Sequence, residues 1–228
     1  MSLAERIGKP MSSRIFQSTR AELSNPFIAM RHGQAAYTPE EDRGGDNVEG
    51  TLTEKGKQIV VAAADEIVQY LREHNITSFT VFTSPKRRCL QTTEIVIDTL
   101  TKAGINCKQQ VVPDLRDVKV IGPTDTMPNS YARWEANMLE GENWFRAWKR
   151  KAKAGMQFYE GEESPDMVRE RVRQALFTVF QLADTFPFLM VCHEEVLGAI
   201  AEILEFAWDD PTYGEVWYIN PANKSTNS

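Results

Sequence analysis

An α/β fold is predicted by the alternation of strand-like and helix-like segments along the 228 residues of the chain. Apolar or β-branched runs of strand length alternate with longer segments whose apolar residues recur every three or four positions, as on one face of a helix. Histidine, serine and arginine residues follow directly after several of the strand-like runs. Because α/β sheets bind ligands just beyond the carboxyl ends of their strands, these residues mark the expected functional site.

The composition is that of one sizeable globular domain, or of a core domain with a cap, since 42% of the residues are hydrophobic and 25% are charged. A formal net charge of −6 argues against non-specific binding to nucleic acid. Three scattered cysteines do not fit a disulfide framework or a zinc site, so a reducing compartment is the default. No apolar run approaches ~20 residues, and the N-terminus lacks the apolar region of a signal peptide. We therefore expect a cytoplasmic protein, monomeric or homodimeric, without membrane or nucleic-acid partners.

The first strand leads to a candidate site at Arg31, His32 and Gly33. Residues 1–25 have mixed charge and isolated apolar positions, so we expect an N-terminal arm of low order or a short helix there. The apolar run at 26–30 then ends in a fixed cation, an imidazole and a glycine. These residues can bind an anion, attack an electrophile or bind a metal, and the glycine lets a ligand approach the backbone closely. For three residues alone, a strand-to-loop exit without chemistry is the alternative.

A polar loop at 34–50 is followed by a helix, for which Thr53 is the expected N-cap. Apolar residues spaced four apart give this helix its buried face. A strand at 78–83 comes next and leads to Ser84, which can cap the following helix with Pro85 at its first position.

Two arginines, Arg87 and Arg88, lie at the expected start of this second helix. Cations there oppose the helix dipole at a cost of about 0.3–1 kcal/mol each. Their presence indicates an anionic ligand that contacts both an arginine and the helix N-terminus. The alternative is an arginine that points into water, which we favour for Arg87.

Residues 119–160 interrupt the alternation and are expected to form a helical cap insertion. A short strand and the segment that carries Asp117 precede them. The insertion is rich in tryptophan and in basic residues, of which Arg146, Lys149 and Arg150 are candidates for substrate selection. The alternatives are a solvated face for the basic residues and core packing within the cap for the tryptophans.

The last third of the chain restores the alternation. Ser164 is the expected N-cap of a helix with Pro165 at its first position. An apolar strand at 188–192 ends at His193, as the first strand ends near His32. The remaining elements are expected to be a helix at 196–206 and a strand at 215–219.

Six segments of the chain resemble, in order, the motifs of the histidine phosphatase superfamily, also called phosphoglycerate mutase-like, over about residues 26–219. The arginine-histidine-glycine signature of that family is Arg31–Gly33 here. The other segments are Leu52–Gly56, Ser84–Arg88 with Thr92 and Thr93, Leu115–Asp117, Glu163–Ser164 with Arg171, and Val191–His193. One motif is a weak indication, whereas six in family order are a strong one. The register selects Arg88 over Arg87.

The resemblance implies a three-layer α/β/α sandwich with a mostly parallel sheet and a helical cap insertion, in a domain at 26–228 that follows the arm. It also implies phosphoryl transfer through a phosphohistidine on His32, with Asp117 as general acid and His193 as a further catalytic residue. Neighbouring cations would keep the His32 imidazole neutral and nucleophilic. The residues implied to bind phosphate are Arg31, Arg88, His193, Gly33 and Thr38.

No metal and no cofactor are expected. Two histidines without a nearby carboxylate triad make a poor metal site, and arginine and histidine can stabilise the transferring group as magnesium does in kinases.

Three departures from the family pattern bear on the site. Glu194 and Glu195 replace the glycine pair that often follows the second histidine, Thr38 stands where many members have asparagine, and Asp117 is one methylene shorter than the common glutamate. Two acids beside a phosphate site would repel the substrate unless they point outward or bind a substrate amine or hydroxyl. Glu194 and Glu195 are therefore candidates for determining specificity.

The expected function is hydrolysis of a small phosphomonoester by a histidine acid-type phosphatase. A cofactor-dependent phosphomutase of the phosphoglycerate mutase type is one alternative, and an inactive relative that binds a phosphorylated ligand is another. Glu194 and Glu195 keep the inactive alternative open. The segment after Asp117 has a single cation, Lys119, and lacks the segment that supplies the second anion site of glycolytic mutases. Water is therefore the expected phosphoryl acceptor.

Overall fold

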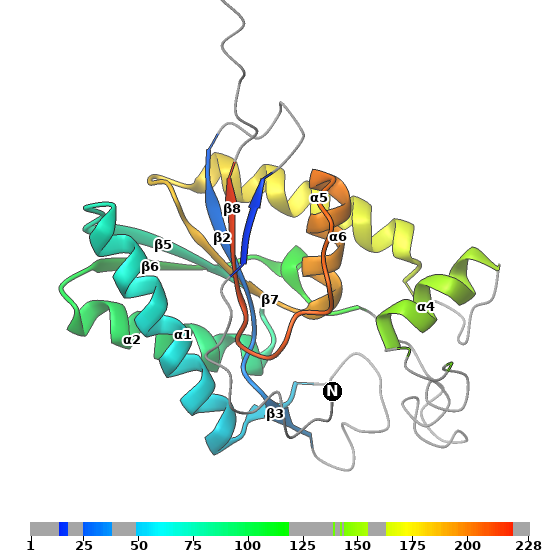
Figure 1. The fold of residues 1–228 in the computed structure, drawn as a ribbon, viewed down its shortest axis with the longest axis horizontal. Coiled ribbons are helices and arrows are strands. Elements are labelled where there is room, and N and C mark those ends of the chain that lie inside the picture. The colour runs from blue at the N-terminus through cyan, green and yellow to red at the C-terminus, as the bar shows by residue number, and fades with distance from the viewer. Residues whose placement is uncertain are drawn as a thin grey trace, which may run out of the picture.

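A six-stranded sheet in the order β1-β8-β2-β7-β5-β6 forms the centre of the molecule (Figure 1). The computed structural model describes residues 14–17, 25–37, 49–118, 139, 142, 144–154 and 163–220. Strands β2, β7, β5 and β6 are parallel, β8 runs antiparallel to β2, and β1 runs parallel to β8. The sheet is thus mostly parallel, as predicted. Its strands are β1 (Arg14–Gln17), β2 (Phe27–Arg31), β5 (Ser78–Thr83), β6 (Asn106–Val111), β7 (Leu189–Cys192) and β8 (Val216–Asn220).

Helices cover both faces of this sheet and complete the predicted α/β fold (Figure 1). Helices α1 and α2 pack on one face, and α5 and α6 pack on the other. A separate two-stranded sheet joins β3 to β4 beside the start of α1. The bounds are β3 (Ala35–Ala36), β4 (Thr51–Leu52), α1 (Glu54–Glu73), α2 (Arg87–Lys102), a 3₁₀ turn η3 (Pro113–Leu115), α4 (Trp144–Lys153), α5 (Pro165–Leu182) and α6 (Glu194–Leu204).

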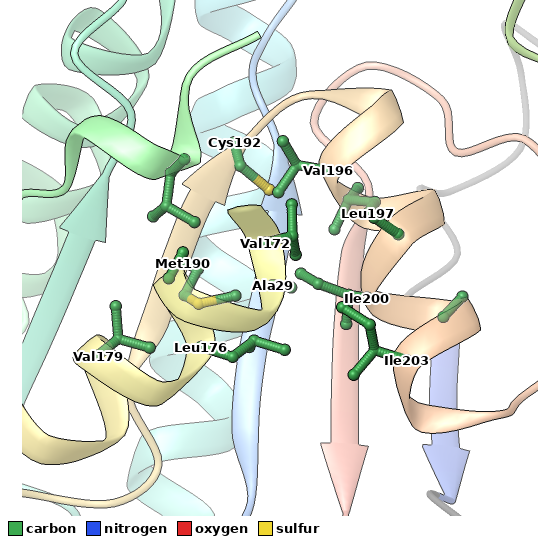
Figure 2. Close-up of a cluster of buried hydrophobic side chains, with 14 of the residues drawn as sticks. Ala29, Val172, Leu176, Val179, Met190, Cys192, Val196, Leu197, Ile200 and Ile203 are labelled. Atoms are coloured by element: carbon green, nitrogen blue, oxygen red, sulfur yellow. The ribbon is translucent and has the colours of Figure 1, made fainter. Parts of the chain in front are cut away.

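The central strands are apolar on both sides because each face is covered by helices. In β2, Phe27 and Ala29 belong to the core under α5 and α6, whereas Ile28 and Met30 belong to the core under α1 and α2. Figure 2 shows the first of these cores, in which side chains of β2 and β7 meet α5 and α6. This two-sided burial holds β2 and β7 in a fixed register, and their carboxyl ends are therefore rigid supports for a site.

Two of the three predicted helix caps are confirmed. The Thr53 hydroxyl accepts a hydrogen bond from Gly56 N at 2.9 Å, and the Ser164 hydroxyl accepts one from Met167 N at 3.2 Å. The expectation that Ser84 caps α2 is wrong, because this helix begins at Arg87 and its N-cap, Lys86, makes no side-chain cap bond. The Ser84 side chain instead contacts His193.

Helix α6 begins earlier than predicted. His193 is its N-cap, and Glu194 and Glu195 occupy its first turn. The carboxylate of Glu194 is favourable near the positive end of the helix dipole, which helps the helix to begin at this residue.

The N-terminal arm is not of low order or helical throughout, since Arg14–Gln17 form the edge strand β1 beside β8. Phe16 stacks on Phe206 with ring centroids 4.4 Å apart, and Arg14 Nε forms an ion pair with Glu215 Oε1 at 2.8 Å. Tertiary contacts thus stabilise a strand too short to be read from local sequence.

Helix α4 lies within the predicted cap and packs against α5, with Ala147 fully buried. Most of the remaining cap prediction falls outside the described residues. In the described part of the chain, none of the helices has the length and apolar character needed to span a bilayer.

Candidate active site

The carboxyl ends of β2, β7 and β5 bring three of the predicted motifs together. Strands β2 and β7 are parallel neighbours with Arg31 opposite Cys192, so His32 and His193 follow side by side. The centroids of the two imidazole rings lie 5.2 Å apart, and His32 N donates to Cys192 O at 3.0 Å. Strand β5 pairs with β7 on the other side and delivers Ser84 to the same edge. The predicted meeting of strand ends is therefore found.

His32 presents an unprotonated Nε2. Its Nδ1 lies 2.8 Å from Gly33 O, and since a carbonyl oxygen can only accept, Nδ1 carries the proton. Nε2 then accepts a hydrogen bond from Arg88 Nε at 3.2 Å. Burial, reinforced by Arg88 and Arg31, lowers the pKa of His32 to about 3. At neutral pH the imidazole is uncharged and keeps the Nε2 lone pair that a nucleophile requires.

Arg88 connects the groups of the site from its place in the first turn of α2. Its side chain is only 1% exposed, and it contacts both histidines: Nε donates to His32, and Nη2 lies 3.2 Å from His193 Nδ1. Nη2 also forms a very short contact with Asp117 Oδ2, and Nη1 donates to Glu49 O at 2.7 Å. Arg87 is exposed, as predicted. A buried guanidinium with these contacts supplies a fixed positive charge beside His32.

His193 is also held neutral and oriented. Because arginine can only donate, His193 Nδ1 accepts from Arg88 and Nε2 carries the proton. Nε2 lies 2.9 Å from Ser84 Oγ, which can accept a hydrogen bond from Nε2–H. Burial is the main cause that holds the pKa of His193 well below its usual value. The serine is therefore an orienting partner of the second histidine, a role that the sequence did not indicate.

Arg31 is enclosed by residues of α6 and of the segment before β8. Its Nη2 pairs with Glu194 Oε2 at 2.8 Å, and its Nη1 donates to Pro211 O at 2.7 Å. Its guanidinium carbon lies 4.2 Å from the ring centroid of Tyr213, at cation–π distance. Tyr213 also lies against His32, with ring centroids 5.8 Å apart. Sequence reasoning missed Tyr213, because the Pro-Thr-Tyr-Gly segment reads only as a turn.

Asp117 and Glu195 form a pair of hydrogen-bonded carboxyl groups. Asp117 follows η3 and accepts from Arg88 through Oδ2 and from Val118 N through Oδ1, the latter at 2.8 Å. Burial alone would raise the pKa of Asp117, but the charge of Arg88 and the hydrogen bond from Val118 N outweigh it and hold this pKa far below the usual range. The predicted general acid is thus ionised at neutral pH.

Arg171 fixes the segment that carries Asp117. Its guanidinium donates to the carbonyl oxygens of Asp114 at 2.6 Å and Arg116 at 3.0 Å. The Glu163 carboxylate, 5% exposed, accepts from both Arg171 and Arg116 at 2.7–2.9 Å. The Glu163 and Arg171 matches in the sequence carried no assigned role, and the structure shows that they position the loop before Asp117.

Gly33 packs so closely against α1 that a side chain at this position would collide with it. A Cβ at this position would lie 2.6 Å from Val60 Cγ2 and 2.8 Å from Gly56 O, both in α1. The glycine therefore permits close packing of the segment after β2 on α1, and the close approach of a ligand to its backbone stays a prediction. Its N–H donates to Thr92 Oγ1 at 3.1 Å.

The other predicted site residues lie elsewhere or outside the described residues. Thr38 is in the latter group. The three basic candidates of α4 all form ion pairs: Arg146 with Asp210 at 3.7 Å, Arg150 with Glu142 at 2.7 Å, and Lys149 with Glu202 through a very short contact. Their role in substrate selection stays a prediction.

The assembled groups have the chemistry of phosphoryl transfer. A neutral imidazole nitrogen, two guanidinium groups, a second imidazole and a carboxyl pair meet at one edge of the sheet. Together they can attack phosphorus, stabilise negative charge on its oxygens and exchange a proton with a leaving group. Among the described residues, no group of three or more His, Cys, Asp or Glu side chains is placed to hold a metal ion.

Solved structures with the same fold include two that are named as phosphatases. A mycobacterial glucosyl-3-phosphoglycerate phosphatase in complex with VO3 superposes with a TM-score of 0.60 at 19% identity, over 85% of this chain and 90% of that one. YhfR of Bacillus stearothermophilus gives a TM-score of 0.55 at 21% identity, over 83% and 87%. A phosphoserine phosphatase of Entamoeba histolytica gives 0.52 at 16% identity, over 84% and 88%.

No curated protein sequence matches this chain. The model of a protein family, described as the histidine phosphatase superfamily (branch 1), matches residues 27–224 and so covers every motif discussed above. With most of its length matched and its six motifs in family order, the chain belongs to branch 1 of the histidine phosphatase superfamily.

Proposed function

We propose that this protein hydrolyses small phosphomonoesters and that His32 carries the phosphoryl group between two half-reactions. The observation that carries the proposal is the state of His32: its Nδ1 proton is used by Gly33 O, and its Nε2 is unprotonated beside Arg88. A buried neutral imidazole keeps an unprotonated nitrogen, which can act as a nucleophile at neutral pH once the phosphoryl group takes over the hydrogen bond from Arg88.

In the first half-reaction, Nε2 of His32 attacks phosphorus and the ester oxygen departs on the opposite side. Arg88 and His193 lie close enough to Nε2 to contact the phosphoryl oxygens. Arg31 adds a second guanidinium, for which the phosphoryl group competes with Glu194. Its Nε is buried and has no hydrogen-bond partner within the described part of the chain, so one donor is left for a ligand. In the second half-reaction, water attacks the phosphohistidine and releases phosphate.

Water is the proposed acceptor because the described residues offer few cations for a second phosphate. The basic residues Arg146, Lys149 and Arg150 of α4 are paired with acids, and Glu194 and Glu195 add carboxyl groups beside the site. The names of the structural neighbours, glucosyl-3-phosphoglycerate phosphatase and phosphoserine phosphatase, support a small phosphorylated substrate. The natural substrate is to be found with a panel of sugar, nucleotide, acyl and peptide phosphates.

The phosphoenzyme is the direct test. Rapid quenching with labelled substrate should trap an acid-labile, base-stable phosphoryl adduct in the wild type, and His32→Ala should lack both the adduct and turnover. His74→Ala is the matched control, because His74 lies exposed at the end of α1 and should leave both readings unchanged. Normal turnover of His32→Ala would refute the proposed mechanism.

A further inference from the structure

The carboxyl group of Glu195 is buried against the reacting groups. Glu195 lies in the first turn of α6, two residues after His193, and is 7% exposed. Its side chain hydrogen-bonds to the Asp117 carboxyl group. An ionised carboxylate can only accept, so one member of this pair must carry a proton.

The contacts of Asp117 decide which member is protonated. Both of its oxygens already accept hydrogen bonds, from Arg88 Nη2 and from Val118 N. A guanidinium stabilises a carboxylate far better than a carboxylic acid, so Asp117 is the ionised member. The proton of the pair therefore resides on Glu195.

The charges around Glu195 agree with this assignment. Burial raises the pKa of Glu195 well above its usual value, and the neighbouring Asp117 and Glu194 raise it further. Within the described part of the chain, Arg88 of α2, Tyr37 after β3 and Cys192 of β7 are further titratable groups close enough to interact electrostatically with Glu195. Two carboxyl groups whose pKa values are pushed apart are the usual arrangement of an acid and its partner.

An ionised Asp117 has no proton to give to a leaving alkoxide, although it is the group placed to act as general acid. We propose that Glu195 stores this proton and delivers it to the leaving group through Asp117. Glu195 is thus a positioning residue that acts on the reaction through Asp117, and the inference rests on the proposed phosphatase function.

The proton and bond changes balance over the two half-reactions. As the His32 N–P bond forms and the ester P–O bond breaks, Asp117 takes the proton of Glu195 and passes it to the leaving oxygen. The alcohol departs and Glu195 is left ionised. When water attacks the phosphohistidine, the N–P bond breaks, a P–O bond forms, and one proton of the water returns through Asp117 to Glu195.

The test compares leaving groups in Glu195→Gln. Glutamine keeps the size of the side chain and can still donate a hydrogen bond to Asp117, but it has no proton to transfer. Hydrolysis of glycerol phosphate, whose alkoxide needs a proton, should fall by on the order of 10²-fold or more. Hydrolysis of 4-nitrophenyl phosphate, whose leaving group needs none, should change little. Asp117→Asn should show the same selectivity and serves as the benchmark.

The pH dependence of turnover separates proton transfer by Glu195 from a purely structural role, because a structural role would leave the shape of the pH profile unchanged. Wild-type turnover of glycerol phosphate should decline as pH rises through the pKa of the Glu195–Asp117 pair, and Glu195→Gln should lack this limb. Glu195→Asp retains a titratable proton and should recover part of the activity on glycerol phosphate. If Glu195→Gln fails to fold, the pH profiles of wild-type turnover are compared between glycerol phosphate and 4-nitrophenyl phosphate. Identical pH profiles on the two substrates would overturn the inference.

The outcomes separate the two proposals. A wild-type protein that hydrolyses neither substrate would refute the proposed function. A wild type active on both substrates, together with a Glu195→Gln variant that loses both equally or neither, would overturn the role of Glu195 alone.

Discussion

At the scale of single residues, the chemistry of the site is set by what each side chain faces. His32 and His193 are both buried beside Arg88, and both are therefore neutral where an exposed histidine would titrate. Protonating either one would place a second positive charge against a buried guanidinium. The same environment that keeps His32 neutral should accordingly make the fold sensitive to acid.

The sign of this effect follows from the pKa of His32. In the unfolded chain the imidazole binds a proton near pH 6.5, whereas in the folded protein it does so only near pH 3. Acid therefore favours the unfolded state, and stability is lost as the pH falls from about 6.5 towards 3. Between pH 7 and pH 5 the wild type should lose about 2 kcal/mol more unfolding free energy than His32→Gln.

Urea denaturation at the two pH values measures this difference. His74→Gln, which replaces an exposed histidine, should keep the pH dependence of the wild type. Equal pH dependence in the wild type and His32→Gln would contradict the prediction.

At the scale of elements, strand β1 supports the wall of the site although it lies outside the residues matched by the family model. Arg14 pairs with Glu215, which is 1% exposed. The other carboxylate oxygen of Glu215 accepts from Thr212 N at 2.8 Å. Thr212 immediately precedes Tyr213, which lies against Arg31 and His32. The edge strand thus fixes a turn that encloses a phosphate-binding candidate.

Removing Arg14 should weaken this support. Arg14→Ala leaves the buried Glu215 carboxylate with fewer donors, so the free energy of unfolding should fall by about 1–3 kcal/mol. Arg169→Ala is the control, because Arg169 forms an exposed ion pair with Asp166, three residues earlier in α5. This substitution should change the free energy of unfolding by less than about 1 kcal/mol. Thermal or urea unfolding measures both, and equal effects would argue against a structural role for β1.

At the scale of the whole molecule, the surroundings of the site favour hydrolysis over a mutase reaction. A mutase holds its phosphohistidine away from water and binds a second anionic group of the substrate. In the described residues, the basic side chains of α4 that could serve this purpose are paired with Glu142, Glu202 and Asp210. The carboxylate of Glu194, which pairs with Arg31, adds negative charge at the edge of the site.

Supplying 3-phosphoglycerate together with catalytic 2,3-bisphosphoglycerate tests this directly. We expect free phosphate from these and from other monoesters, with little isomerisation, because water reaches the phosphohistidine first. A colorimetric phosphate assay beside chromatography of the phosphoglycerates follows both products. Rapid isomerisation with little free phosphate would identify a mutase.

The sequence by itself determined the fold class and predicted that the candidate site residues meet at one edge of the sheet. Strand-length apolar runs ending in His32 and His193 predict their meeting, because parallel strands of one sheet end at one edge. The caps Thr53 and Ser164 were readable because a helix start depends on a few neighbouring residues.

The tertiary structure decided what depends on groups distant in the chain. Ser84 could be taken for a helix cap until His193 was placed 2.9 Å from its hydroxyl. Glu194 and Glu195 look alike in the sequence, yet Glu194 pairs with Arg31 whereas Glu195 hydrogen-bonds to Asp117. Whether a carboxyl group is protonated depends on its burial and on charged groups from other elements. Both act only once the sheet and its helices are assembled.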